Sequence, residues 1–242
     1  MSKLKQEQID ILEKNGCTSD SWNKIEVKDN IDLNKIRNVN FLNNVSLGIY
    51  SEKILLPENV EINTGIYNTT LNNVVIDDNC YISNVELISN TNIQSNVIIQ
   101  NSGIIACTKE TTFGNGHEIE VLNEGGGREL PITTVTNSQI GYLNVLYRDK
   151  NKLINNLNKI AQKYADSVKS NILKIGNNVI IDNTDKIINV NINEYAKILG
   201  VKLLEEGTID SSEKAKTVVT NGVIADNFIF QKGCSVKDGA MI

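Results

Sequence analysis

Large apolar side chains recur at every sixth position near the C-terminus of this chain. Phe230, Val236 and Ile242 stand six residues apart, and the smaller Cys234 and Ala240 follow the first two after four positions. An amphipathic helix would place its apolar residues three and four positions apart, so this spacing argues against a helix. A large residue, a corner and a small residue in each unit of six are typical of coils built from short strands. The pattern therefore predicts a hexapeptide-repeat β-helix.

The same unit recurs upstream, and its corner residues are distinctive. Most units carry Asn or Gly just before the second inward residue, and these residues adopt a left-handed backbone at small cost. Units return after about 17 to 20 residues in places, which favours a three-sided coil. We therefore expect a mainly β chain folded as a left-handed parallel β-helix. The upstream units span residues 56–60, 76–80, 93–97, 175–179, 192–196, 204–208 and 224–228.

The repeat predicts which side chains line the interior of the coils. Ile76, Ile93, Ile175 and Val236 take the large inward position, and each buried aliphatic side chain contributes roughly 1.5 to 3 kcal/mol. Two of the four cysteines, at positions 80 and 234, take the small inward position, where a free thiol behaves as a small hydrophobe. The cysteines lack a CxxC spacing, so neither a disulfide nor a metal site is expected.

Composition narrows the classes of partner. The chain has 242 residues, 36 of them Asn, and a formal net charge of -5 without a basic cluster, which argues against a nucleic acid or an anionic membrane as the partner. The Asn residues alternate in register with Ile and Val, so corner chemistry explains them better than a disordered tract. The first residues lack the apolar core of a signal peptide. A cytoplasmic chain without a cofactor is the simplest expectation.

Residues 1–35 depart from the six-residue repeat and are expected to form a cap. Residues 3–15 predict a short amphipathic helix that ends at Gly16, with Leu4, Ile9 and Leu12 on one face. Such a helix would cover the strand edges of the first coil. Trp22 is expected to belong to the same cap.

Residues 137–170 change to a helical period. Their apolar residues stand three, four and seven apart, and a break near residues 148–151 divides the pattern into two helices. We expect this stripe to pack against the outside of the coils, and a coiled-coil seam to a partner subunit is the alternative. The stripe consists of Ile140, Leu143, Leu146, Leu153, Leu157, Ile160, Tyr164 and Val168.

A glycine-rich loop within residues 108–136 is the candidate ligand-binding segment. Consecutive glycines expose backbone amides, and beside an Arg they can hold a phosphate or a carboxylate. In the alternative interpretation, the segment is a corner or a long hairpin in which Arg128 pairs with Glu124 or Glu129. The candidate ligand-binding residues are Glu124, Gly125, Gly126, Gly127 and Arg128.

His117 is the sole histidine of the chain and hence the sole candidate for a histidine general base. Hexapeptide-repeat acyltransferases use one histidine in this way, but a glycine-flanked loop is equally compatible with an exposed, inactive imidazole. A three-histidine zinc site cannot be built by one such chain.

Several motifs of the chain are typical of one known family. They are Gly16-Cys17 with Trp22, and residues 65–68, 113–116, 121–129, 139–143 and 146–148. In these motifs and in the order of its parts, the chain resembles an uncharacterised bacterial family of hexapeptide-repeat, left-handed β-helix proteins. The resemblance spans essentially the whole chain, and the segment 121–129 is its most specific part. At position 117 the chain departs from that pattern, where residues other than His are usual.

The resemblance implies a transferase-like protein whose members are longer, so a catalytic centre is expected beyond Ile242. One hypothesis is the N-terminal part of a transferase for a sugar phosphate, a nucleotide sugar or an acyl-CoA donor. The other is a non-catalytic scaffold or oligomerisation module, and a homo-oligomer is expected in either case. The expected division is a cap (1–35), a first β-helix segment (36–107), a glycine-rich loop (108–136), a helical insertion (137–170) and a second, truncated β-helix segment (171–242).

Overall fold

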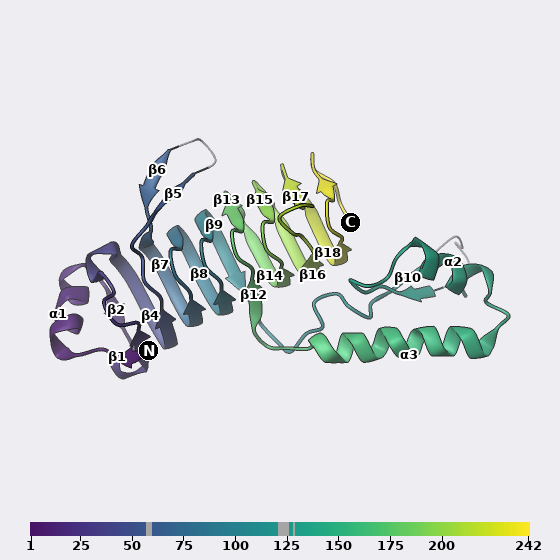
Figure 1. Ribbon diagram of the computed structural model, residues 1–242, viewed down its shortest axis with the longest axis horizontal. Coiled ribbons are helices and arrows are strands. Elements are labelled where there is room, and N and C mark those ends of the chain that lie inside the picture. The colour runs from purple at the N-terminus through teal and green to yellow at the C-terminus, as the bar shows by residue number, and fades with distance from the viewer. Residues whose placement is uncertain (57–59, 121–125, 128) are drawn as a thin grey trace.

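The chain is mainly β, and most of its strands pair in parallel in one sheet. The computed structural model describes residues 1–56, 60–120, 126–127 and 129–242. The strands stack side by side along the long axis of the molecule (Figure 1). In chain order they are β1 (Ser2–Lys3), β2 (Thr18–Ser19), β3 (Ile25–Val27), β4 (Ile36–Leu47), β7 (Gly65–Ile76), β8 (Tyr81–Ile93), β9 (Ile98–Ala106), β12 (Leu173–Ile175), β13 (Ile180–Asp182), β14 (Lys186–Ile192), β15 (Lys197–Leu199), β16 (Leu203–Ile209), β17 (Val218–Thr220), β18 (Ile224–Phe230) and β19 (Ser235–Val236).

Parallel pairing of the strands builds columns of buried side chains, although the register shifts by one residue within the β4–β7 and β7–β8 pairs. Ile82 pairs with Ile99, 17 residues later, and the register continues to Ile181 across the inserted helices. Residues in such a column lie one strand spacing apart, about 4.8 Å, and their side chains are fully or almost fully buried. One column contains Ile36, Ile66, Ile82, Ile99, Ile181, Ile198 and Val219; a second contains Phe41, Leu71, Ile88, Ile105, Ile187, Leu204 and Ala225; a third contains Leu47, Ile76, Ile93, Ile175, Ile192, Ile209 and Phe230.

Burial of the third column confirms the predicted inward positions of Ile76, Ile93 and Ile175, which are at most 1% exposed. Val236 packs against the same core and is partly buried. We call each turn of the chain a coil; the turn from Ile82 to Ile99, for example, takes 17 residues. Its apolar core lies between the three columns, so no single coil encloses a core without its neighbours.

Asparagine at the corners explains the composition. Asn84 and Asn101 have φ of 55° and 48°, in the left-handed region that Asn adopts more readily than other residues with a side chain. Their side chains also bond along the stack: Asn68 donates to Asn84 at 2.8 Å, and Asn84 donates to Asn101 at 3.2 Å. Each corner Asn therefore serves both the turn of its own coil and the contact with the next coil.

The spacing of the inward residues varies from corner to corner, and two of the units predicted from the sequence are therefore misplaced by one residue. The inward residues Ile76 and Cys80 are four apart, as predicted, but Ile82 and Val85 are three apart, with Asn84 at the corner. In the unit at 204–208, Gly207 rather than Thr208 takes the inward position. In the unit at 224–228, Ala225 rather than Ile224 does. The large inward residues of one coil, Ile82, Ile88, Ile93 and the following Ile99, are thus spaced by six, five and six.

The predicted unit at 56–60 is wrong. Its flanking residues form an antiparallel hairpin of β5 (Lys53–Leu55) and β6 (Glu61–Asn63) that leaves the stack (Figure 1). Val60 is 52% exposed, so it lines no core. Because the hairpin is inserted between them, the paired residues Ile36 and Ile66 are separated by 30 residues instead of the 17 between Ile82 and Ile99.

The N-terminal residues cover the first coil. The helix predicted over residues 3–15 is observed as α1 (Gln6–Lys14), and it is followed by Gly16 with a φ of 79°. Leu12 is fully buried in the core. Trp22 begins a short 3₁₀ helix (Trp22–Lys24). Its ring is tilted against that of Phe41 with the centroids 6.0 Å apart, and its indole N–H donates to the carboxylate of Glu13 in α1. A second 3₁₀ helix spans Leu33–Lys35.

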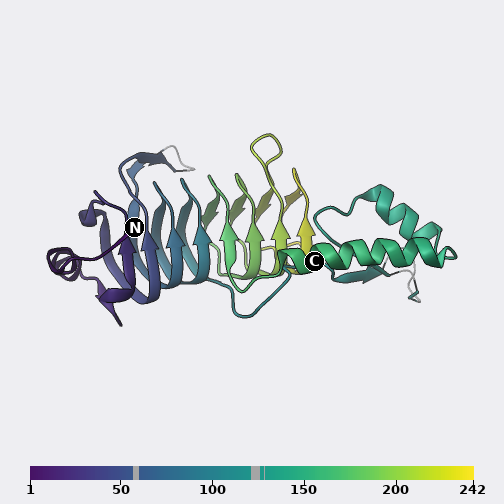
Figure 2. The same ribbon diagram turned by 60° about the horizontal axis from the view of Figure 1, so that its bottom comes forward.

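Residues 108–170 form a projection that we call the arm. It contains a hairpin of β10 (Glu118–Glu120) and β11 (Glu129–Pro131) and two helices, α2 (Ser138–Leu146) and α3 (Asn151–Val168). Figures 1 and 2 show that the hairpin and the two helices of the arm extend past the last strands instead of covering the outside of the stack. The predicted packing of the helical stripe on the coils is therefore wrong.

A different face of α3 is buried from the one that was predicted. Ile154, Ala161 and Ala165 are buried, whereas Ile160 is 61% exposed. The small alanines let the helix approach the hairpin closely, because a side chain at Gly116 would already meet Ala165 at 3.0 Å. Helix α3 thus buries its alanines together with Ile154 within the arm and leaves Ile160 at the surface.

The base of the arm is attached to the stack by Glu206. This residue has a φ of 46° and takes the corner position that Asn189 holds one coil earlier. Its carboxylate accepts hydrogen bonds from Thr111 at 2.5 Å and Asn189 at 2.8 Å, and it pairs with Lys109 at 2.8 Å. Burial acts to raise the pKa of Glu206, but these donors outweigh it and hold the pKa below its ordinary value.

The two cysteines predicted to face the interior differ in their burial. The thiol of Cys80 is fully buried, and desolvation raises its pKa to about 12, so it remains protonated in the core. Cys234 packs against the core with partial exposure.

In the described parts of the chain, none of the helices has the length and apolarity needed to span a bilayer. A cytoplasmic location stays a prediction.

Candidate functional site

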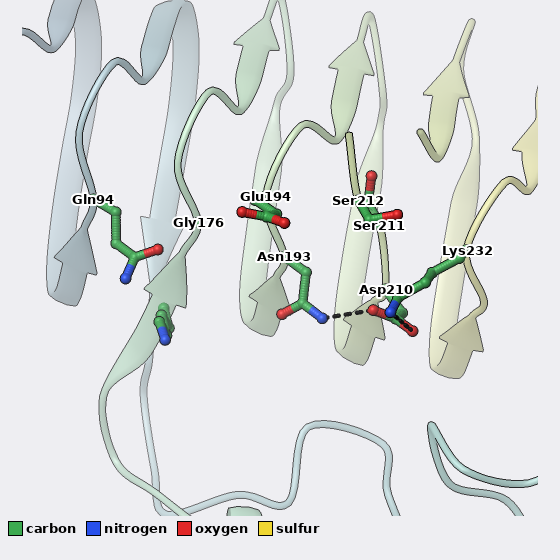
Figure 3. Close-up of a pocket in the computed structure, with 9 residues that line it drawn as sticks. Gln94, Gly176, Asn193, Glu194, Asp210, Ser211, Ser212 and Lys232 are labelled. Carbon is green, nitrogen blue, oxygen red and sulfur yellow. Dashed lines mark hydrogen bonds and ion pairs between the residues drawn. The ribbon is translucent and has the colours of Figure 1, made fainter. Parts of the chain in front are cut away.

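A polar groove crosses several coils on one side of the stack (Figure 3). Its volume is about 270 Å³. Figure 3 shows Asn193, Asp210 and Lys232 converging at one end and Gln94 at the other. The residues that line this groove are Gln94, Lys174, Gly176, Asn193, Glu194, Asp210, Ser211, Ser212 and Lys232.

The floor of the groove is a continuous row of backbone hydrogen bonds. The residue that follows each buried isoleucine of the third column donates its N–H to the next coil. Gln94 donates to Ile175 O at 2.9 Å, and Gly176 donates to Ile192 O at 2.8 Å. This row keeps the outward side chains at a fixed spacing, as a binding surface on a rigid scaffold requires.

The groove has room for a ligand at Gly176 because this residue has no side chain. Where neighbouring coils carry Gln94 and Asn193, this coil has no side chain. A Cβ atom at Gly176 would lie 2.4 Å from the backbone nitrogen of Glu194, so the next coil occupies the place of a side chain. The glycine is thus required by a close backbone approach, and it also lowers the floor of the groove.

Charges of both signs lie along the groove. Asp210 accepts a hydrogen bond from the side chain of Asn193 at 2.7 Å, and the Nζ of Lys232 lies 4.0 Å from its other carboxylate oxygen. The side chain of Asp210 is 16% exposed and that of Lys232 is 54% exposed. Because the lysine is only weakly paired, its ammonium group remains available to a ligand, while Asp210 and Asn193 present oxygen and amide groups to hydroxyls.

Of the predicted candidate residues that the structure describes, His117, Gly126 and Gly127, none lines this groove. His117 lies on the arm just before β10, where it is exposed. Within the described residues, its imidazole has no hydrogen-bond partner, and its backbone alone is bonded, to Gly114 and Ile132. A general base needs a partner that orients it or a substrate within reach, and the described structure provides neither at His117.

The glycine-rich candidate segment lies only partly within the described structure. Glu124, Gly125 and Arg128 fall outside the described residues. Gly126 and Gly127 have φ of 76° and 89°, and the N–H of Gly127 donates to the carboxylate of Glu129 at 2.6 Å. That donor is therefore used within the hairpin, and a ligand-binding role for this segment stays a prediction.

Glu129 also pairs with an arginine of the arm. Arg148 lies 3.3 Å from the Glu129 carboxylate. The hydrogen bond from Gly127, with the charge of Arg148 as a further cause, lowers the pKa of Glu129. A backbone amide and a guanidinium group thus hold a carboxylate of the protein itself, in the manner that the sequence predicts for a bound anion.

The fold and the groove define a class: a mainly β protein of stacked parallel strands that carries a polar surface groove. The family is shown by a match over residues 1–242 to the model described as Domain of unknown function (DUF4954), so the chain belongs to that family. It is also 25% identical over 244 residues to an "Uncharacterized protein" of Treponema pallidum (strain Nichols). That alignment covers 96% of this chain and 34% of the relative, so the chain spans about a third of its relative's length.

The groove was missed in the sequence, although two signals mark it. Gly176 replaces the polar residue found at the same place in neighbouring units. The coil from Ile198 to Val219 contains 21 residues instead of 17, and its extra residues follow Asp210 along one wall. Gln94 and Lys174 are brought together only because the register continues across the arm.

Proposed function

We propose that this chain is the left-handed, three-sided β-helical part of a larger transferase-like protein, and that its groove binds a sugar phosphate or a nucleotide sugar. The left-handed winding of the coils is supported by the likeness of their corners to those of hexapeptide repeats, which place Asn or Gly in the left-handed backbone region. The division into cap, coil segments and arm belongs to the same proposal. The complete catalytic centre would lie outside this chain.

The chemistry of the groove carries the proposal. Ligand hydroxyls would be bound by the carboxylates and amides of Asp210, Glu194 and Asn193, and a phosphate by Lys232 or Lys174. Carboxylate and amide groups bind hydroxyls with directional hydrogen bonds, and an ammonium group binds phosphate as a point charge. An acyl-CoA donor fits less well, because its pantetheine arm would find few apolar side chains there.

A ligand screen with matched variants tests this proposal. Titration of the 15N-labelled chain with glucose 1-phosphate, UDP-glucose and acetyl-CoA should give saturable shifts at Gly176, Asn193 and Asp210 with one of the first two compounds. Lys232→Ala should weaken that binding by about tenfold or more, since a charged hydrogen bond contributes about 1.5 to 3 kcal/mol. Lys214→Ala, an exposed lysine of the neighbouring loop that lines no part of the groove, is the control.

A non-catalytic scaffold is the second candidate. It is favoured by the exposed position of His117, whose side chain has no hydrogen-bond partner among the described residues. If none of the three compounds shifts the groove amides, the scaffold interpretation replaces the ligand-binding one. Sedimentation velocity of the chain then tests the expected homo-oligomer.

A further inference from the structure

The strands that carry the first buried column also form a flat surface on the outside of the stack. β8, β9, β13, β15 and β17 each contribute one inward residue to that column. The residues directly before and after it point outward, because side chains alternate along a strand. We call these outward residues of the five strands the outer face. β9, β13, β15 and β17 follow one another along the stack (Figure 1), and none of the outward residues lines the groove.

Half of the outer face is apolar or aromatic. In a sheet with one face in water, outward residues are usually polar. Here Ile98 is 3% exposed, and the other large side chains are half-buried against their neighbours in the next coils. A closely packed, partly apolar surface of this kind is typical of a protein contact. Its apolar and aromatic residues are Tyr81, Ile98, Ile180, Leu199 and Val218.

Asp182 is the acidic residue of the outer face, and its carboxylate is incompletely paired. The residue is 8% exposed, and its Oδ1 is buried without a hydrogen-bond partner among the described residues. Its neighbours in register are Gln100 and Leu199, and neither bonds to it. Burial of an unpaired carboxylate is costly, so a cation brought to this position would stabilise the protein.

Lys197 is the basic residue of the outer face. It is half-buried, and within the described part of the chain its ammonium group takes part in no ion pair. The register places Lys197 beside Ile180 and Leu199 beside Asp182, so the two charges lie on neighbouring coils and two positions apart along the strands. Their backbones are therefore about 8 Å apart, and the two side chains do not pair within one chain.

We propose that the outer face is an interface between two copies of this chain, in which Asp182 of each copy pairs with Lys197 of the other. The twofold axis lies between the two faces and crosses the line from Asp182 to Lys197 at its midpoint, at a right angle. Such an axis exchanges the two positions, so two equivalent ion pairs form and the apolar residues of both copies meet.

The charges favour a second copy over other occupants of this face. A surface with one acidic and one basic residue, both unpaired, is complementary to itself under a twofold axis. An anionic lipid surface would attract Lys197 but leave Asp182 without a partner.

Charge reversal tests the proposal on the full chain by sedimentation velocity. We expect the native chain to dimerise reversibly as its concentration rises. Asp182→Lys and Lys197→Asp each place like charges opposite one another at both pairs. Each should therefore raise the dissociation constant at least about 100-fold, about tenfold for each pair. Lys186→Asp, the same change of charge at an exposed position on β14, is the control and should have no effect.

Mixing the two variants separates this interface from any other. One variant carries lysine at both positions and the other carries aspartate at both, so an equimolar mixture can form a heterodimer with both ion pairs restored. We expect the mixture to associate about as tightly as the native chain. Melting curves show whether each variant is folded. If Asp182→Lys does not fold, Asp182→Asn, which keeps the size of the side chain, should weaken dimerisation at least about tenfold.

Three results would overturn the proposal. A native chain that stays monomeric up to about 1 mM would show that solvent alone satisfies Asp182. Dimerisation that both charge variants leave unchanged would place the contact on another surface. A mixture that associates no better than the separate variants would exclude the twofold pairing. Because none of the variants alters the groove, its ligand titration is independent of each result.

Discussion

Glu206 has two roles: its backbone forms a corner of the coil, and its side chain bonds to the arm. The substitution Glu206→Asn keeps the first role and removes the second. Glu206 has a φ of 46° in a column where neighbouring coils carry Asn189 and Asn227. Asn tolerates this backbone better, so Glu206→Asn should relieve about 1 kcal/mol of strain in the coil. The shorter side chain no longer reaches Thr111, so the attachment of the arm should weaken.

The magnitude follows from the contacts that are lost. The hydrogen bond from Thr111 at 2.5 Å joins a hydroxyl to a charged carboxylate, a type that contributes about 1.5 to 3 kcal/mol. The side chain of Lys109 is 64% exposed, so its ion pair adds little. The bond from Asn189 can be kept by the new amide, as in the other asparagine pairs. The net loss of global stability is therefore small, about 1 kcal/mol.

Hydrogen exchange measures the local effect. The arm amides near Thr111 and Ser170, which exchange backbone hydrogen bonds at 2.9 and 3.0 Å, should exchange roughly 10 to 100 times faster in Glu206→Asn. Glu205→Gln, one residue earlier on the same strand, is the matched control and should leave these amides unchanged. Unchanged exchange in Glu206→Asn would refute the assigned attachment.

The same contact predicts a pH dependence with a defined sign. The folded pKa of Glu206 is depressed, so its contribution to stability is fully present above the unfolded value of about 4.3. The contribution is lost as the pH falls through the folded pKa. The protection of the arm amides, taken relative to the intrinsic exchange rate at each pH, should therefore fall on acidification below about pH 4 in the native chain, and this fall should be absent from Glu206→Asn.

Three further substitutions test the packing of the coils, each by urea unfolding. Ile175→Asp should unfold the stack, because it buries an unpaired charge, whereas Ile160→Asp at a 61% exposed site should have little effect; equal effects would contradict the assigned interior. Gly176→Ala should destabilise by about 1 to 3 kcal/mol, because its Cβ would lie 2.4 Å from a backbone nitrogen, and an unchanged midpoint would show that the next coil moves freely. Asn84→Ala should cost about 2 kcal/mol, from the strain of a φ of 55° and the loss of two side-chain bonds to Asn68 and Asn101; a cost near zero would remove the structural role of the asparagine row.

The sequence predicts the third buried column because its corners use the spacing that defines a hexad. Ile76 and Cys80, like Ile93, follow that spacing, so their inward positions are confirmed. The other corners place inward residues three apart, as at Ile82 and Val85, with Asn on the left-handed backbone between them. A prediction that requires inward residues to be four apart does not find these corners. It therefore places the units at 204–208 and 224–228 wrongly by one residue.

The groove and the position of the arm depend on long-range pairing, which a local pattern does not contain. Lys174 lies beside Asn92 because β12 resumes the register of β8 after the arm. The helical period marks where helices occur, but Ala161 and Ala165 pack more closely than the larger residues beside them, and this packing selects the buried face. The direction of the arm follows from contacts at Glu206 and Thr111 that have no signature in sequence.

The central claim is that one parallel register continues across the arm, and engineered disulfides test it most directly. Ile104 and Lys186 are paired outward residues on neighbouring coils, and Leu203 is the next residue in that column. Under mild oxidation, Ile104→Cys with Lys186→Cys should crosslink, since paired strands lie about 4.8 Å apart, within the range of a disulfide. Ile104→Cys with Leu203→Cys, two spacings apart, should not. Efficient crosslinking of the second pair, or failure of the first in a folded protein, would contradict the account.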